Sequence, residues 1–212
     1  MNKIENTLKF YYDTIKLKEK IRSGWNDENW NVKGRRETVA EHIHGTQMLA
    51  LAIYSNFNVN IDIYKVNMML ALHETEEIRM PDFTPFSKIS SEERKIMGEE
   101  SVRQTCKSLD KNEFVISLIN EFNERKTNEA RFAYYCDKLE CDLQAKKYSD
   151  NRFCTIEEAN QEMLKDERIQ EIIEAGFDTV ADIFIEYDRN KFGDTVFRFI
   201  LDYVQNINVN NL

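Results

Sequence analysis

The chain has 212 residues, 42% of them hydrophobic, and a formal net charge of −9 at pH 7. This length suits one substantial domain with its own core, and no apolar run reaches the about 20 residues of a membrane span. The negative charge argues against a nucleic-acid polymer as main partner, because binding its phosphate backbone needs clustered Lys and Arg. The polar N-terminus lacks the apolar stretch of a secretory signal, so we expect a cytoplasmic location.

The composition favours helices over strands. The chain contains only six glycines and two prolines, and so few helix-breaking residues are typical of long helices with short connections. The four cysteines show no CxxC spacing, so free thiols are expected instead of a zinc site or a redox pair. The sequence therefore predicts an all-α fold, a single-domain helical bundle covering residues 1–212.

Three helices are predicted in the first third of the chain. Apolar residues at three- and four-residue spacings predict a helix over residues 3–22. A second helix is expected to begin at 37–41 and to run through Tyr54. A third should cover residues 61–72, with Asn60 as its N-cap. This third segment is apolar on nearly all sides, which indicates a central, buried helix.

The rest of the chain is also expected to be helical. A proline- and aromatic-rich loop at 80–86 precedes a sequence that resembles a capping box at Ser90, which predicts a helix reaching Leu109. Further helices are predicted over residues 112–123, 128–148, 155–165, 167–175, 178–187 and 191–206. The aromatic residues of the last segment are expected in the core: Phe192, Phe197, Phe199 and Tyr203.

Two of the three histidines stand beside carboxylates at points where a helix is predicted. His42 follows Glu41 near the start of the second predicted helix, and His73-Glu74 directly follows the most apolar stretch of the third. Ionisable groups in such a place are costly unless they are paired or bound to a metal. Together with Asp137 on the predicted helix 128–148, they form a donor set that suits Mn, Co, Fe, Zn or Ni.

Such a site favours hydrolysis of a phosphate ester, because a bound divalent cation polarises a phosphoryl oxygen and acidifies its water. Glu77 is four residues after His73 and is expected to share its helix face, which makes it a candidate general acid or base. Arg22 and Arg36 are candidate cations for the phosphoryl oxygens. Glu76 is interpreted as a solvated charge at the rim of the site.

Simpler interpretations exist for each of these residues. A single histidine on an apolar helix is more often a hydrogen-bonded core residue than a metal ligand. His44, two residues from His42, points to another side of the helix and is expected to have a structural role. Asp137 is followed by Lys138, and such a helical pair is usually a surface ion pair.

Three motifs occur in a recognisable order. They are RETVAEH at 36–42, ALHETEE at 71–77 followed by Asp82, and CDKLE at 136–140 followed by Gln144-Ala145. The sequence resembles the HD-domain phosphohydrolase superfamily, and most of all its branch of 5′-deoxynucleotidase-type proteins. Arg22-Ser23-Gly24-Trp25 is similar to a short element of that branch that helps hold the substrate. The similarity covers about residues 5–150, and the predicted helices of residues 155–206 carry no recognised motif.

The resemblance implies a helical bundle with a metal ion between helices, held by His42, His73, Glu74 and Asp137. It implies that Glu77 is the catalytic acid or base and that Asp82 is a second catalytic carboxylate, and that Arg22 and Trp25 contact the substrate. Nucleoside 5′-monophosphates or similar small phosphate esters are the implied substrates, and the implied assembly is a homodimer.

The chain departs from the family pattern in two places. The His-Asp doublet of the superfamily is His73-Glu74 here, and the extra methylene displaces the carboxylate by about 1.5 Å. Pro81 stands before Asp82 where the branch has a glycine, which stiffens this loop. Either the pocket has shifted to another substrate or catalysis has been weakened.

Two other functions are compatible with these patterns. The first is a catalytically degenerate HD domain that binds a nucleotide or a metal or serves as a scaffold, which the glutamate of the doublet supports. The second is an all-α nucleotide pyrophosphohydrolase that binds magnesium through its acidic clusters. The histidines argue against the second function, since magnesium prefers oxygen ligands. The acidic cluster would comprise Glu74, Glu76, Glu77 and Asp82.

Overall fold

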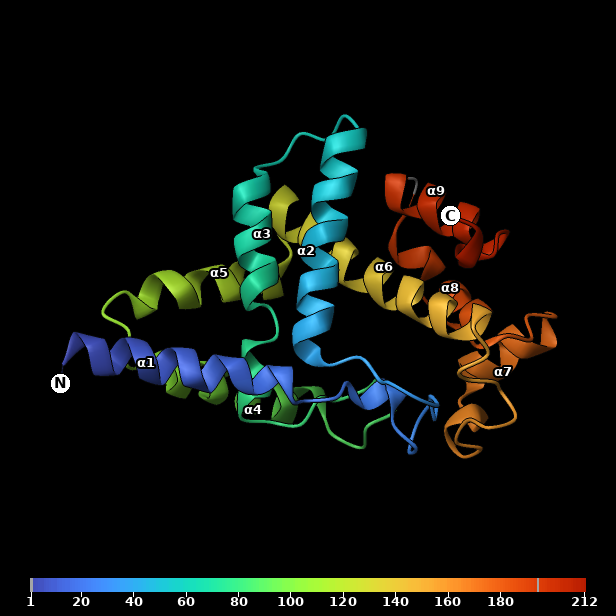
Figure 1. Cartoon of the computed structure of the whole chain (residues 1–212), viewed down its shortest axis with the longest axis horizontal. Helices are drawn as coiled ribbons and strands as arrows, with labels where there is room; N and C mark the ends of the chain where they lie inside the picture. Colours follow the sequence, from blue (N-terminus) through green and yellow to red (C-terminus); the bar gives the residue numbers. More distant parts are fainter. Residues whose placement is uncertain (1, 194) are drawn as a thin grey trace. The chain divides into compact units, whose positions relative to one another are not determined.

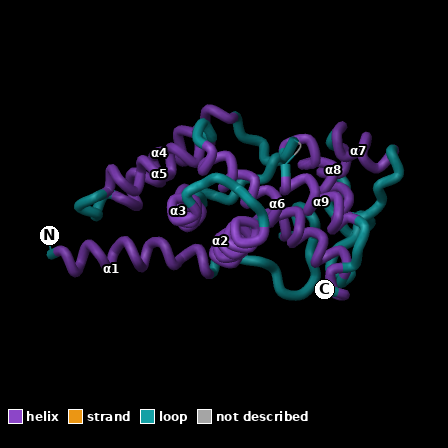
Figure 2. Tube along the Cα trace, turned by 90° about the horizontal axis from the view of Figure 1, so that it is seen from above, coloured by secondary structure: helices purple, strands orange, loops and turns teal. Residues whose placement is uncertain are grey.

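The structure, a computed structural model, describes residues 2–193 and 195–212 and is built from helices joined by loops (Figures 1 and 2). The described residues form no strand, and they contain an isolated antiparallel bridge between Ile21 and Thr38. The predicted all-α class is therefore confirmed.

The chain divides into two compact units. One comprises Met1–Ile21 and Thr38–Tyr134, and the other comprises Arg22–Glu37 and Tyr135–Leu212. The boundary at residues 134 and 135 falls inside one uninterrupted helix. The single domain over residues 1–212 stays a prediction.

The first unit contains α1 to α5 and the beginning of α6. Their bounds are α1 Lys3–Thr14, α2 Val39–Asn56, α3 Ile63–Leu72, α4 Ser91–Cys106, α5 Asn112–Glu124 and α6 Asn128–Asp150. Helices α2 and α3 lie side by side, α3 also packs on α5, and α4 packs on both α5 and α1. The predicted first helix is too long, because α1 ends at Thr14 and continues only as a 3-10 turn, Ile15–Lys18.

Side-chain caps fix where the helices that carry the site begin. Thr38 and Glu41 form a reciprocal capping box at the start of α2, and Ser90 and Glu93 form another at the start of α4, as predicted. Asp62, not Asn60, caps α3, since its carboxylate accepts from two backbone N–H groups of the first turn.

Helix α3 is only partly buried. Its residues Ile63, Val66 and Met69 lie in the core, but Tyr64 is 86% exposed and Met68 is also on the surface. The prediction of a central, buried helix is therefore confirmed for one face of α3 and wrong for the face that carries Tyr64 and Met68. The hydrophobicity of a segment shows that it can be buried, but the neighbours available in the fold decide which of its faces are covered.

The second unit contains the rest of α6 and three shorter helices. These are α7 Glu167–Glu174, α8 Val180–Asp188 and α9 Val196–Gln205. The helix predicted over 155–165 is wrong, because this stretch is mostly turns and contains only the 3-10 helix Met163–Lys165. Asp194, which falls within the helix predicted over 191–206, lies outside the described residues.

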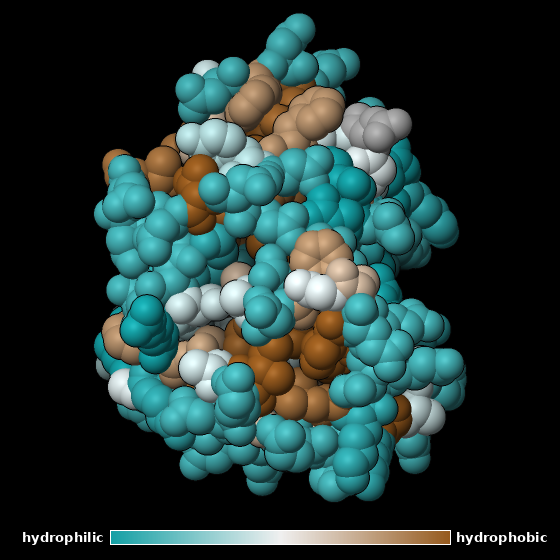
Figure 3. All heavy atoms as spheres, turned by 90° about the vertical axis from the view of Figure 1, so that its right-hand side faces the viewer, coloured by the Kyte–Doolittle hydropathy of each residue, from teal (hydrophilic) through white to brown (hydrophobic). Residues whose placement is uncertain are grey.

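An aromatic cluster forms the core of the second unit. Trp25, 1% exposed, stacks on Phe184 with ring centroids 5.3 Å apart and meets the edge of Tyr148. Phe192 and Phe197 are buried as predicted. The prediction is wrong for two other aromatic residues of the last segment, Phe199 (66% exposed) and Tyr203 (62% exposed). Figure 3 shows apolar side chains exposed among hydrophilic ones on one face of the molecule.

A buried carboxylate in the second unit destabilises the fold at neutral pH. Asp142 on α6 is 1% exposed, and its Oδ2 accepts no hydrogen bond from the described residues. Burial, and secondly the charge of Asp188, raise the pKa of the Asp142 carboxyl well above its ordinary value. The pKa of such a carboxyl is higher in the folded than in the unfolded state. It therefore lowers the free energy of unfolding as the pH rises from the pKa of the unfolded state to above the pKa of the folded state.

Replacing Asp142 with asparagine should therefore raise the free energy of unfolding by about 1–3 kcal/mol at pH 7.5. The gain should shrink towards pH 4, where the wild-type carboxyl is protonated in the folded state. Urea denaturation at both pH values measures the difference, with the exposed Asp178→Asn as control. Equal stabilisation at both pH values would contradict the electrostatic explanation.

All four cysteines are free thiols. Among the described residues, no helix combines the length and the apolar character needed to cross a membrane.

Candidate metal centre

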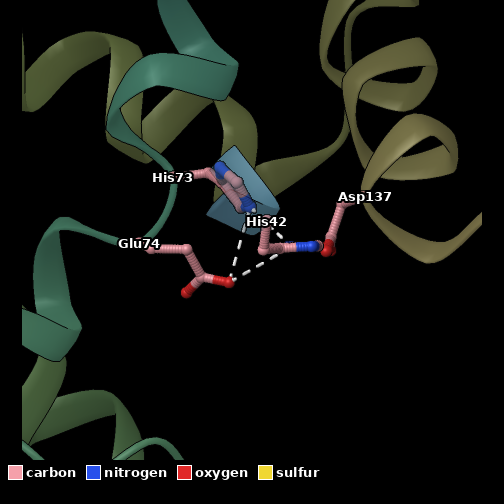
Figure 4. A group of neighbouring side chains, drawn as sticks. All are labelled: His42, His73, Glu74 and Asp137. Atoms are coloured by element: carbon pink, nitrogen blue, oxygen red, sulfur yellow. Dashed lines mark hydrogen bonds and ion pairs between the residues drawn. The ribbon is translucent and has the colours of Figure 1, made fainter. Parts of the chain in front are cut away.

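Two helix ends in the first unit bring His42, His73 and Glu74 together. His42 lies in the first turn of α2 and is fully buried. His73 is the C-cap of α3, and Glu74 precedes the 3-10 helix Thr75–Ile78. Since α3 ends at Leu72, the expectation that Glu77 lies one α-helical turn after His73 on a common face is wrong. His73 and Glu74 lie between the end of α3 and the start of this 3-10 helix, and both side chains point toward His42 (Figure 4).

The three donor atoms have the spacing of ligands around one metal ion. His73 Nε2 lies 3.3 Å from His42 Nε2 and 3.4 Å from Glu74 Oε1, and His42 Nε2 lies 3.6 Å from Glu74 Oε1. Bonds of about 2.1 Å separate tetrahedral ligands by about 3.4 Å and neighbouring octahedral ligands by about 3.0 Å. The three atoms therefore fit a single divalent cation.

A backbone contact of His73 sets the chemistry of its other ring nitrogen. His73 Nδ1 lies 2.7 Å from the carbonyl oxygen of Leu70. A carbonyl only accepts, so Nδ1 carries the hydrogen and Nε2 of the neutral ring has a lone pair. That lone pair faces a second imidazole nitrogen and a carboxylate oxygen, an arrangement that a cation stabilises. A carbonyl partner on the far nitrogen is also what commonly orients a metal-bound histidine.

Asp137 is the fourth member of the group. One donor atom from each of His42, His73, Glu74 and Asp137 lies within 4.8 Å of the others (Figure 4). Asp137 is 6% exposed, and the ammonium of Lys138 lies 3.0 Å from its Oδ2. The neighbouring lysine thus forms an ion pair as expected, but the aspartate is a buried residue instead of a surface one.

The predicted catalytic carboxylates lie on the turn that follows the doublet. Glu77 belongs to the 3-10 helix Thr75–Ile78 and is buried. Asp82 is half-buried in the loop that leads to α4. Both residues follow Glu74 closely in the sequence, Glu77 on the 3-10 helix and Asp82 in the loop after it. Their catalytic roles stay predictions.

Glu76, expected at the solvated rim, is instead packed against α4. A Cβ atom added at Gly98 would lie 2.3 Å from Glu76 Oε2, so the absence of a side chain there makes room for this carboxyl. Ser101 Oγ donates to the carbonyl oxygen of Glu76 at 2.5 Å. Burial, and secondly the charge of Glu74, raise the pKa of the Glu76 carboxyl.

The predicted substrate-binding residues Arg22, Trp25 and Arg36 all lie in the second unit. Trp25 is buried, and its Nε1 donates to Glu37 Oε2 at 3.0 Å, so it supports the core there and offers little surface. Arg22 Nη1 lies 3.9 Å from the same oxygen. Arg36 donates to Val32 O and to the Asp27 carboxylate.

Sequence reasoning missed a buried acidic pair in the second unit. Glu37 and Glu140 are both buried, and burial, followed by the charge of Glu37, raises the pKa of the Glu140 carboxyl well above its ordinary value. Glu37 stands in the motif that contains His42, and Glu140 stands in the motif that contains Asp137. Their positions in RETVAEH and CDKLE were the available signal.

Comparison with known proteins shows the family to which the chain belongs. The model of the family described as HD domain matches residues 14–207. The protein named 5′-deoxynucleotidase HDDC2 from Dictyostelium discoideum is 28% identical over 152 residues, which is 68% of this chain and 78% of that protein. The Homo sapiens protein of the same name is 28% identical over 136 residues, 63% of this chain and 64% of that protein.

Solved structures share the fold. A predicted metal-dependent phosphohydrolase from Magnetospirillum magnetotacticum superposes with a TM-score of 0.65 at 18% identity, over 96% of this chain and 95% of that one. The PH0347 protein from Pyrococcus horikoshii gives a TM-score of 0.60 at 22% identity, over 95% and 97% of the two chains. The family expected from the motifs is confirmed, and the chain belongs to the HD domain family.

Proposed function

We propose that this protein is a metal-dependent phosphomonoesterase that acts on nucleoside 5′-monophosphates or a similar small phosphate ester. The observation that carries the proposal is the spacing of His42 Nε2, His73 Nε2 and Glu74 Oε1, which lie 3.3–3.6 Å from one another. Membership of the HD domain family and relatives named 5′-deoxynucleotidase support the substrate class.

The bound group is proposed to be one divalent transition metal ion from the set Mn, Co, Fe, Zn and Ni. His42, His73 and Glu74 would hold it, with Asp137 as the fourth ligand. Two imidazoles and two carboxylates form a donor set of intermediate hardness, which suits these ions better than magnesium or calcium. When bound, such an ion supplies Lewis acidity and lowers the pKa of a water molecule.

The remaining chemistry belongs to the chain's own carboxylates and cations. Glu77 is proposed to take the proton of the attacking water and to return a proton to the leaving alcohol oxygen. Asp82 is proposed to orient the same water or the leaving group. Arg22 and Arg36 are proposed to bind phosphoryl oxygens, for which Arg36 would exchange the exposed Asp27 for the substrate.

Glu74 in place of the family's aspartate does not by itself speak against catalysis. Its Oε1 already lies 3.4–3.6 Å from both imidazole nitrogens. The backbone leaves the α-helix at this residue, with φ −99° and ψ 17°, and we propose that this conformation accommodates the longer side chain. This accommodation favours an active enzyme over the degenerate binding module.

We also propose a homodimer in the cytoplasm. Met48 and Leu51 on α2 and Met68 on α3 are exposed apolar residues on neighbouring helices, and a second copy would cover them. A single-chain mass in light scattering would contradict the dimer. The four free thiols suit a reducing compartment, and a protein found only outside the cytoplasm after cell fractionation would contradict the location.

The proposed function is tested by phosphate release from ribo- and deoxynucleoside 5′-monophosphates. The protein is first stripped with EDTA and then assayed with Co²⁺, with Mn²⁺ and without metal. We expect metal-dependent release from one or a few substrates of the panel. Metal bound without any release would favour the degenerate module, and pyrophosphate release from triphosphates would favour the pyrophosphohydrolase.

A further inference from the structure

Two side chains hold the far end of the turn that carries Glu77: Lys20, and Arg79, which donates to Thr105 Oγ1 at 3.1 Å and to the Asp13 carboxylate. The ammonium of Lys20 donates to the carbonyl oxygens of Glu77 and Met80, each at 2.5 Å. These two carbonyls stand on either side of Arg79, where the 3-10 helix Thr75–Ile78 has ended. A lysine offers three N–H donors and no acceptor, so it can hold both carbonyls at once.

Lys20 is itself fixed to the helix that carries His42. Its carbonyl oxygen accepts from the backbone N–H of Val39 at 2.8 Å. The next residue, Ile21, forms the isolated antiparallel bridge with Thr38, which caps α2. Lys20 therefore ties the start of α2 to the turn after Glu74, although the two are far apart in sequence.

The beginning of the same turn is held from another side. On α4, the hydroxyl of Ser101 donates to the carbonyl oxygen of Glu76, and Gly98 leaves room for the Glu76 side chain. Both contacts are made by Glu76, the residue before Glu77 in the sequence. Lys20 acts on Glu77 itself and on Met80, two residues before Asp82. Without Lys20, the carbonyls of Glu77 and Met80 would lose this donor, while Arg79 would keep its contacts with Thr105 and Asp13. The metal-ligand candidates His42, His73 and Glu74 would keep their own contacts.

We infer that Lys20 is a positioning residue for the hydrolytic reaction, which sets the place of the carboxylates of Glu77 and Asp82 relative to the metal ligands. The inference rests on the proposed function. It separates two roles along one short segment, with metal binding at His73 and Glu74 and proton transfer at Glu77 and Asp82. Displacing a catalytic group by about 1 Å can cost about 100-fold in rate.

The test compares Lys20→Met, which keeps the aliphatic chain and loses the donors, with Lys20→Arg, which keeps donors. Lys18→Met is the matched control, because Lys18 lies on the same segment and is exposed. Four quantities are measured for each protein. The first is metal affinity, and the other three, measured in the metal-loaded protein, are kcat and KM with the best nucleotide and hydrogen–deuterium exchange of the peptide covering residues 77–86.

Lys20→Met is expected to speed exchange in this peptide and to lower kcat by about 10- to 100-fold, with metal affinity and KM changed less than threefold. Lys20→Arg should recover most of kcat, and Lys18→Met should match wild type. Unchanged exchange at 77–86, or unchanged kcat, in Lys20→Met overturns the inference. Loss of metal together with kcat also overturns it, since the effect would then be on the ligands. If the wild type releases no phosphate, the proposed function fails, and the exchange result still decides whether Lys20 holds the turn.

Discussion

Replacing His73 with alanine is expected to remove both the bound metal and phosphate release. The imidazole supplies one of three donor atoms that lie 3.3–3.6 Å apart, and its orientation is fixed by the Leu70 carbonyl. Changes in residues that only support a ligand typically weaken metal affinity by 10- to 100-fold. Loss of the ligand itself should therefore weaken affinity by at least about 100-fold.

The control for this variant is His44→Ala. His44 lies on α2, two residues from His42, and is exposed. The His44→Ala protein should bind metal and release phosphate as the wild type does. Metal content by mass spectrometry and phosphate release are measured on the same preparations, with circular dichroism to confirm the helical fold. An active, EDTA-sensitive His73→Ala protein would contradict the ligand assignment.

Replacing Glu77 with glutamine is expected to lower the rate of phosphate release while leaving the metal bound. Glutamine keeps the size of the side chain but cannot take a proton, so kcat should fall by about 100- to 10,000-fold. Metal affinity should stay within about threefold of wild type, because Glu77 is not among the four grouped donors. The pH dependence of kcat should also lose the limb that reports the general base.

Glu92→Gln on the exposed first turn of α4 is the matched control. It removes the same charge at the surface and should leave kcat unchanged. If Glu77→Gln retained kcat with an unaltered pH profile, Glu77 would be a structural residue of the buried turn, and Asp82 would become the leading candidate for proton transfer.

Local signals predicted the helices well where side chains define the helix ends. The capping box at Ser90 and Glu93 and the helix beginning at 37–41 both appear in the structure. The end of α3 at Leu72 was also predicted, but the end of α1 at Thr14, which no Gly or Pro marks, was missed. The local pattern does not reveal this end, because the helical spacing of apolar residues continues past Thr14 to Ile21.

The candidate metal ligands could be named from the sequence because histidines are few and stand beside carboxylates. The structure groups His42, His73, Glu74 and Asp137. The argument for Glu77 was wrong, since it assumed a continuous α-helix. The role of Lys20 could not be predicted at all. Its partners are backbone carbonyls about 60 positions away, and no residue type marks a carbonyl that needs a donor.

The most direct test of the metal centre is a crystal of the protein grown with Co²⁺ and measured at the cobalt absorption edge. The arrangement predicts one anomalous peak at about 2.0–2.2 Å from His42 Nε2, His73 Nε2 and Glu74 Oε1. A fourth bond to the Asp137 carboxylate is expected at a similar distance. A peak elsewhere, or no peak between these residues at saturating Co²⁺, would contradict the account.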